Sequence, residues 1–127
     1  MTKGIDVAGY QGSPNWAAVA KAGYEFAYVK ASEGGSSSYP TSGPQFIGSM
    51  AAGLATGLYH YARPTLTAQA NAQAFAAQVN RLCPAGGSGR VLPPCLDLEV
   101  GTGQLGGWAK AFFTELRRLT GHQRVML

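Results

Sequence analysis

The chain has 127 residues, of which 46% are hydrophobic and 13% are charged, and its formal net charge is +4. This composition fits one globular domain with a buried core and excludes a disordered chain, and no apolar run approaches the roughly 18 residues that span a bilayer. The basic charge favours anionic partners, but no basic cluster interleaved with aromatic residues indicates nucleic-acid binding.

Short apolar runs alternate with amphipathic stretches along the chain. The clearest helical pattern follows Thr67, a residue suited to the N-cap, and places apolar residues at three-four spacing. Asn15 and Gly23 suit the start and the end of the first helix, and Gly121 suits the end of the last one. In chain order the sequence predicts a strand at 4–10, a helix at 15–23, a strand at 26–32, a helix at 43–56, a strand at 58–62, a helix at 67–82, a strand at 95–100, a helix that carries Trp108 to Leu119, and a fifth strand at 124–127.

Alternating strands and helices with short connections predict parallel strands joined by right-handed crossovers. Two arrangements fit this order, an open doubly wound sheet and part of a (β/α) barrel. The segment GYQGSPNW after the first strand is neither G-x-G-x-x-G nor a phosphate loop, which disfavours a cofactor-binding open sheet. We therefore predict an α/β fold, a partial (β/α) barrel, formed by residues 1–127 as one domain.

Two carboxylates stand two positions apart in the fourth strand, in PPCLDLEV. Strand alternation puts Asp97 and Glu99 on one face. Asp6 and Glu33 lie near the ends of their own strands, and the C-terminal strand ends of a barrel point into one shared mouth. Two carboxylates are the usual groups of glycoside hydrolysis, although an isolated D-x-E is more often a solvated or paired feature. Their Cα spacing of about 6.6 Å leaves the stereochemical outcome open.

Cys83 and Cys95 enclose a Gly-rich loop. A disulfide between them could stabilise the fold by about 3 kcal/mol in an oxidising compartment, and two reduced thiols are an equal alternative. The cysteine spacing does not fit a zinc site, and only His60 and His122 could add ligands, so we expect no metal. We expect His60 to be a satisfied core residue, or one that supports site residues from behind, and not a catalyst.

Five segments add weight to the acids: GIDVAGYQG, the following NW, FAYVKASEG, GLYHYARP and LDLE. In order and spacing they resemble the glycoside hydrolase family 25 lysozymes, the Chalaropsis-type N-acetylmuramidases, over essentially the whole chain. The resemblance implies a (β/α)5β3 TIM-like barrel, of which this chain would hold about five parallel strands and four helices. It also implies cofactor-free hydrolysis of the β-1,4 bond between N-acetylmuramic acid and N-acetylglucosamine in peptidoglycan.

The resemblance further implies roles for the three acids. Glu99 would be the general acid. Asp97 would assist on the other side, as the nucleophile or by orienting the N-acetyl group of the substrate, and net retention is favoured. Asp6 would tune charge and hydrogen bonding in the mouth.

Four other positions match residues that line the sugar cleft: Lys30, Glu33, Tyr59 and Tyr61. Each has a plainer alternative. The two tyrosines could be ordinary core aromatics, and the lysine and glutamate could form a surface ion pair worth less than about 1 kcal/mol.

The family domain continues beyond the fifth strand with three more strands and another active-site Asp, whereas this sequence stops at Leu127. We therefore expect residues 1–127 to form the N-terminal two-thirds of the domain, with unclosed barrel edges that favour self-association. The rival hypothesis is a non-catalytic wall-binding or assembly module with the same half-barrel. Peptidoglycan is the expected partner in both cases. We expect an extracellular protein or a phage-encoded lysin that acts on the cell wall. No signal peptide is visible, which favours the phage lysin.

Overall fold

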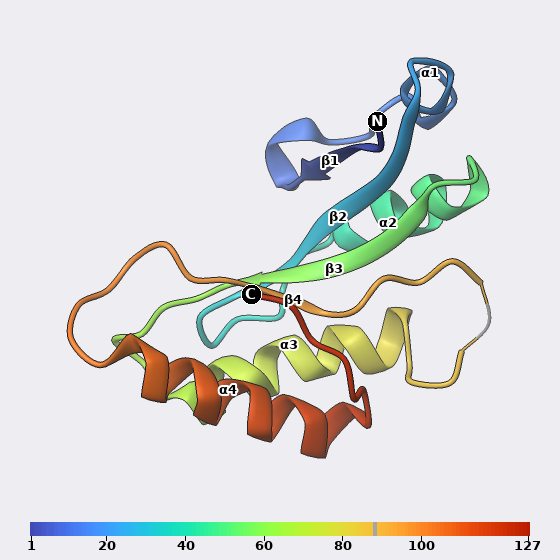
Figure 1. The fold of residues 1–127 in the computed structure, drawn as a ribbon. Coiled ribbons are helices and arrows are strands. Elements are labelled where there is room, and N and C mark those ends of the chain that lie inside the picture. Colours follow the sequence, from blue (N-terminus) through green and yellow to red (C-terminus); the bar gives the residue numbers. More distant parts are fainter. Residues whose placement is uncertain (88) are drawn as a thin grey trace.

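The computed structural model describes residues 1–87 and 89–127, and its centre is a four-stranded parallel sheet with the order β1-β2-β3-β4 (Figure 1). Strands that are adjacent in the sheet are consecutive in the chain, so the connections run through the helices as in a (β/α) barrel. This confirms the predicted α/β partial barrel. The strands are β1 (Lys3–Val7), β2 (Tyr24–Glu33), β3 (Ala55–Tyr61) and β4 (Cys95–Asp97); the helices are α1 (Trp16–Lys21), α2 (Ser42–Ala51), α3 (Ala68–Leu82) and α4 (Leu105–Thr120), with a 3-10 turn η1 (Gly9–Gln11).

The core lies between the sheet and the helices. Figure 1 shows α3 and α4 side by side, and both contribute phenylalanines that are completely buried, Phe75 and Phe112. From the sheet, Val29 of β2 and Leu58 of β3 are also completely buried. Because strand side chains alternate between faces, the neighbouring residues of each strand point to the opposite face, which is open.

Side-chain caps fix the starts of two helices. Asn15 accepts a hydrogen bond from the N–H of Ala18 at the start of α1, and Thr67 accepts one from the N–H of Ala70 at the start of α3. Each bond satisfies an N–H that has no partner within the helix. Both predicted caps are confirmed.

We expect Thr67→Ala to lower the free energy of unfolding by about 1 kcal/mol, because the N–H of Ala70 loses its acceptor. Urea unfolding of the two proteins, followed by circular dichroism, measures the difference. Thr65→Ala is the matched control, since Thr65 is exposed and precedes the helix. Equal losses in both variants would contradict a capping role.

Several predicted elements differ from the structure at their ends; the strand predicted at 4–10, for example, ends at Val7, and a 3-10 turn follows at Gly9–Gln11. The helix predicted over 43–56 ends at Ala51, and residues from Ala55 onward belong to β3. Gly53, with φ of +90°, allows the chain to turn between them. In place of a fifth strand at 124–127, the structure has one isolated parallel bridge between Met126 and Cys95. The segment therefore lies beside β4 as expected, but in strand conformation at a single position only.

The fourth strand is shorter than predicted, because β4 ends at Asp97 and Glu99 lies in the loop that follows. Of the two alternatives for the cysteines, a disulfide or two reduced thiols, the structure has the second, since Cys83 and Cys95 are both free. Cys83 is buried in the core at the end of α3, whereas Cys95 lines the cavity on the open face of the sheet. The two cysteines thus belong to different layers of the fold. Burial raises the pKa of the Cys83 thiol to about 12.

No helix in the described ranges combines the length and the apolar character required to cross a bilayer.

Candidate active site

A cavity of about 820 Å³ lies on the open face of the sheet. It contains three of the residues that the sequence singled out as acids, Asp6, Asp97 and Glu99, together with Tyr59. The rest of its lining is mainly apolar or aromatic: Gly4, Ile5, Tyr24, Phe26, Tyr28, Cys95, Leu96, Leu98 and Leu127.

The strands bring the three carboxylates together around the phenol of Tyr59. Asp6 comes from β1 at one edge of the four-stranded sheet, and Asp97 comes from β4 at the opposite edge. Glu99 lies in the loop after β4. Burial raises the pKa of Tyr59, and the charges of Asp6, Asp97 and Glu99 raise it further in that order. The three carboxylates and this phenol therefore line one cavity, and the charges of the acids act on the phenol.

The environments of Asp97 and Glu99 differ. Asp97 is half-buried, and burial, followed by the neighbouring Glu99, raises the pKa of its carboxyl, while Lys30 acts in the opposite direction. Glu99 is exposed at the end of β4. Of the two carboxyls, that of Asp97 is therefore the more buried.

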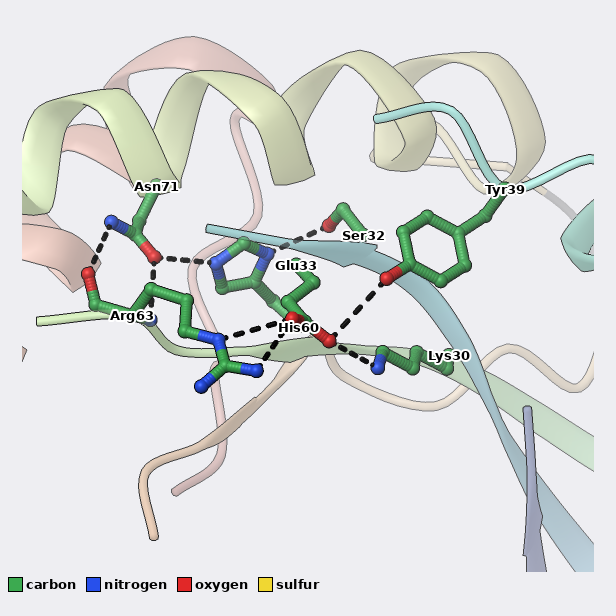
Figure 2. A network of polar contacts seen from close by, with 7 residues as sticks. All are labelled: Lys30, Ser32, Glu33, Tyr39, His60, Arg63 and Asn71. Atoms are coloured by element: carbon green, nitrogen blue, oxygen red, sulfur yellow. Dashed lines mark hydrogen bonds and ion pairs between the residues drawn. The ribbon is translucent and has the colours of Figure 1, made fainter. Parts of the chain in front are cut away.

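Beside this cavity, Glu33 is the centre of a charged cluster. Its carboxylate lies 2.6 Å from Nζ of Lys30 and 2.8 Å from the guanidinium of Arg63 (Figure 2). A hydrogen bond from Lys30 lowers the pKa of Glu33, burial opposes it, and Arg63 adds to the lowering. Both cations also lie 4.9 Å from the ring centroid of Tyr61. The side chains of Lys30 and Glu33 are only 14% and 26% exposed, so the pair is partly buried and not a solvated surface pair.

Sequence analysis missed two members of this cluster. Arg63 follows Tyr61 by two positions, and the alternation beyond β3 could have indicated that they share a face. Tyr39 comes from the loop after β2, and its hydroxyl donates to Glu33 at 3.4 Å. No local pattern indicated this contact, because it depends on the path of a Gly- and Ser-rich loop.

His60 lies on the helix side of the sheet and is completely buried. Its two ring nitrogens contact Ser32 at 2.7 Å and Asn71 at 2.9 Å (Figure 2). The ring stacks with Phe112 at a centroid distance of 5.5 Å. This confirms the prediction that His60 is a satisfied core residue.

The chemistry of the cavity is that of carboxyl and phenol groups. In the described part of the chain, no three His, Cys, Asp or Glu side chains gather in a way that could hold a metal ion. Carboxyls at one mouth can donate a proton to a leaving oxygen and stabilise positive charge on a sugar ring. The fold and this mouth together are those of a partial (β/α) barrel with an acidic cleft at its strand ends.

Comparisons with known proteins agree with this description. The model of the glycosyl hydrolases family 25 matches residues 5–127. Lysozyme M1 of Streptomyces globisporus is 39% identical over 101 residues, which cover 76% of this chain and 32% of that protein. The N,O-diacetylmuramidase of Chalaropsis sp is 32% identical over 133 residues, which cover 94% of this chain and 62% of that protein.

Among solved structures, the bacterial lysozyme from Streptomyces coelicolor superposes with a TM-score of 0.84 at 32% identity, covering 98% of this chain and 61% of that one. The chain therefore spans about a third to just under two thirds of the length of these relatives. The chain belongs to glycosyl hydrolase family 25.

Proposed function

We propose that this chain carries the acidic cleft of a peptidoglycan muramidase, which cleaves the β-1,4 bond between N-acetylmuramic acid and N-acetylglucosamine. One observation carries the proposal: in a member of family 25, Asp6, Asp97 and Glu99 line one cavity of about 820 Å³ together with Tyr59. The names of its relatives, which include lysozymes and N,O-diacetylmuramidases, support the same substrate class.

In the proposed mechanism Glu99 is the general acid. Its position in the loop at the end of β4 leaves its carboxyl exposed, so it can reach the glycosidic oxygen of a polymer that enters from solvent. Loss of the leaving sugar builds positive charge on the neighbouring ring. Asp97, deeper in the cavity, assists there as the nucleophile or by orienting the N-acetyl group of the substrate.

The surrounding groups set the charge of the cleft. Burial, Glu99 and Asp6 raise the pKa of Asp97, and Lys30 opposes this rise, which favours the carboxylate that this role requires. Asp6, which lines the same cavity as Tyr59, adds further negative charge there. Tyr59 from the cavity, and Lys30, Glu33 and Tyr61 beside it, would contact the sugars.

Incubation with purified cell walls tests the proposal. Hydrolysis should clear the turbidity of the suspension and release reducing ends in proportion to the protein added. The rival function, a wall-binding or assembly module, predicts that the protein sediments with insoluble peptidoglycan and releases no reducing ends. A protein that neither binds nor hydrolyses walls would contradict both.

We propose that the protein works outside the producing cell or as a phage-encoded lysin, because its substrate class is the cell wall. The names of two structural neighbours, the CTP1L endolysin and the endolysin ply40 from bacteriophage P40, are in line with the second alternative.

We also propose that the 127-residue chain self-associates through the unclosed edges of its sheet. In the described residues β1 forms one edge of the four-stranded sheet, with β2 as its partner strand. Unpaired strand edges favour contact with a second copy. Size-exclusion chromatography with light scattering should give a mass of at least twice 13.2 kDa. A compact monomer over a tenfold range of concentration would contradict self-association.

A further inference from the structure

Strand β2 contains one more residue than β3 near the end where the two strands reach the cleft. Lys30 pairs with Tyr59 and Ser32 pairs with His60, so Ala31 has no partner of its own. Such a β-bulge changes which face the following side chains occupy. Ala31 and Ser32, although consecutive, are both completely buried.

This bulge determines the position of Glu33. In a regular strand the side chains of Lys30 and Glu33, three positions apart, would point to opposite faces. The extra residue returns Glu33 to the face of Lys30, where its partner on β3 is Tyr61. The 2.6 Å contact between the two charged groups follows from this change of face.

A buried hydrogen-bond chain holds the bulge from the helix side of the sheet (Figure 2). The N–H of Arg63 donates to Oδ1 of Asn71 at 3.0 Å, so Oδ1 is an acceptor, and the Nε2 atom of His60, 2.9 Å away, must be the donor. The Nδ1 atom of His60 is then the acceptor for the Ser32 hydroxyl at 2.7 Å. One tautomer of His60 thus links β2, β3 and α3.

The surroundings of this chain keep it intact. Ser32, His60 and Asn71 are all completely buried, and the imidazole lies between Phe75 and Phe112. Burial lowers the pKa of His60 to about 4, so the ring is neutral at higher pH. The order Ser–His–Asn is that of a nucleophilic triad, but the hydroxyl is sealed from the cleft and cannot meet a substrate.

We propose that His60 is a positioning residue for the cleft: through Ser32 it fixes the β-bulge in β2 and thereby places the Glu33 carboxylate against Lys30 on the substrate side of the sheet. The inference rests on the proposed function, since it gives a role in the cleft to Glu33 and Lys30. His60 and Ser32 themselves touch no sugar, because they lie on the helix side of the sheet, opposite the cleft.

The test compares two buried serines. Ser32→Ala removes the hydroxyl that holds the bulge, and Ser49→Ala removes an equally buried hydroxyl, 2.7 Å from Thr56, far from the bulge. The pKa of the Glu33 carboxyl, followed by carbon NMR, is expected to rise towards its ordinary value in Ser32→Ala and to stay low in Ser49→Ala. Wall hydrolysis is expected to fall by up to about 100-fold in the first variant only.

An unchanged Glu33 pKa in a folded Ser32→Ala protein would overturn the proposal, and so would equal changes in both variants. Nitrogen NMR of His60 in the unmodified protein provides a test that needs no variant: a proton on Nε2 is expected, and a proton on Nδ1 would contradict the Ser32 contact. The Glu33 titration does not depend on activity. If the protein hydrolyses no walls, the proposed function is refuted, but the titration still tests the positioning role of His60.

Discussion

Replacing Glu99 with glutamine is expected to lower the rate of wall hydrolysis by about 100-fold to 10,000-fold, the usual contribution of general acid–base catalysis. The amide has nearly the same shape but cannot supply the proton to the leaving oxygen. Glu99 is exposed, lies in the loop beyond β4 and takes no part in a salt bridge found in the described residues, so the fold should not change. Release of reducing ends under initial-rate conditions measures the loss.

Asp97→Asn is the paired variant for this measurement. It is expected to reduce hydrolysis as well, because Asp97 faces the same cavity, and its residual rate reports on the assisting role. Glu115→Gln is the control, since Glu115 forms its ion pair with Arg118 on α4, outside the cavity lining. Equal rates for the unmodified protein and Glu99→Gln would remove Glu99 as the acid. A much larger loss in Asp97→Asn would give that role to Asp97.

Lowering the pH from 7 to 4 is expected to lower the free energy of unfolding by about 3 kcal/mol through His60 alone. Burial lowers the pKa of His60 from 6.5 to about 4 in the folded chain, so between these values only the unfolded chain binds the proton. Since the unfolded state binds more protons in this window, stability rises with pH from 4 to 6.5 and is constant above it with respect to this group.

His60→Gln separates this effect from those of the carboxyls. Urea unfolding at several pH values should show a weaker pH dependence in the variant than in the unmodified protein between pH 4 and 6.5. Asp97, whose pKa is raised in the folded chain, makes stability fall as the pH rises. Glu33, whose pKa is lowered, makes stability fall as the pH drops, below its ordinary pKa of 4.5. Both are retained in the variant, so the difference between the two curves isolates His60. Identical curves would mean that His60 is not a buried neutral group.

Periodicity and capping residues were sufficient to predict most of the fold. Thr67 caps the start of α3 and Gly121 caps the end of α4, as expected. Capping was predictable because it depends on residues within one turn of the helix end. The end of α2 was wrong because MAAGLAT continues an apolar pattern that suits both a helix and a strand. Pairing of residues 55–57 with β2 decides in favour of the strand, and this pairing is a long-range contact.

The acids of the cleft were predictable for a similar reason. Asp6 is the penultimate residue of β1 and Asp97 the last residue of β4, and parallel strands of one sheet bring their C-terminal ends to one side. The position of Glu33 was not predictable from alternation, because the bulge before it depends on a hydrogen bond between Ser32 and His60, residues that are 28 positions apart. The contact between Tyr39 and Glu33 likewise depends on a loop path that the sequence pattern does not determine.

The products of wall digestion test the central claim most directly. Purified peptidoglycan is digested, the new reducing ends are converted to alcohols with borohydride, and the released sugars are identified by mass spectrometry. A muramidase site made by Asp6, Asp97 and Glu99 predicts new reducing ends on N-acetylmuramic acid, with few or none in Glu99→Gln. New ends on N-acetylglucosamine, or none from a protein that sediments with walls, would contradict it.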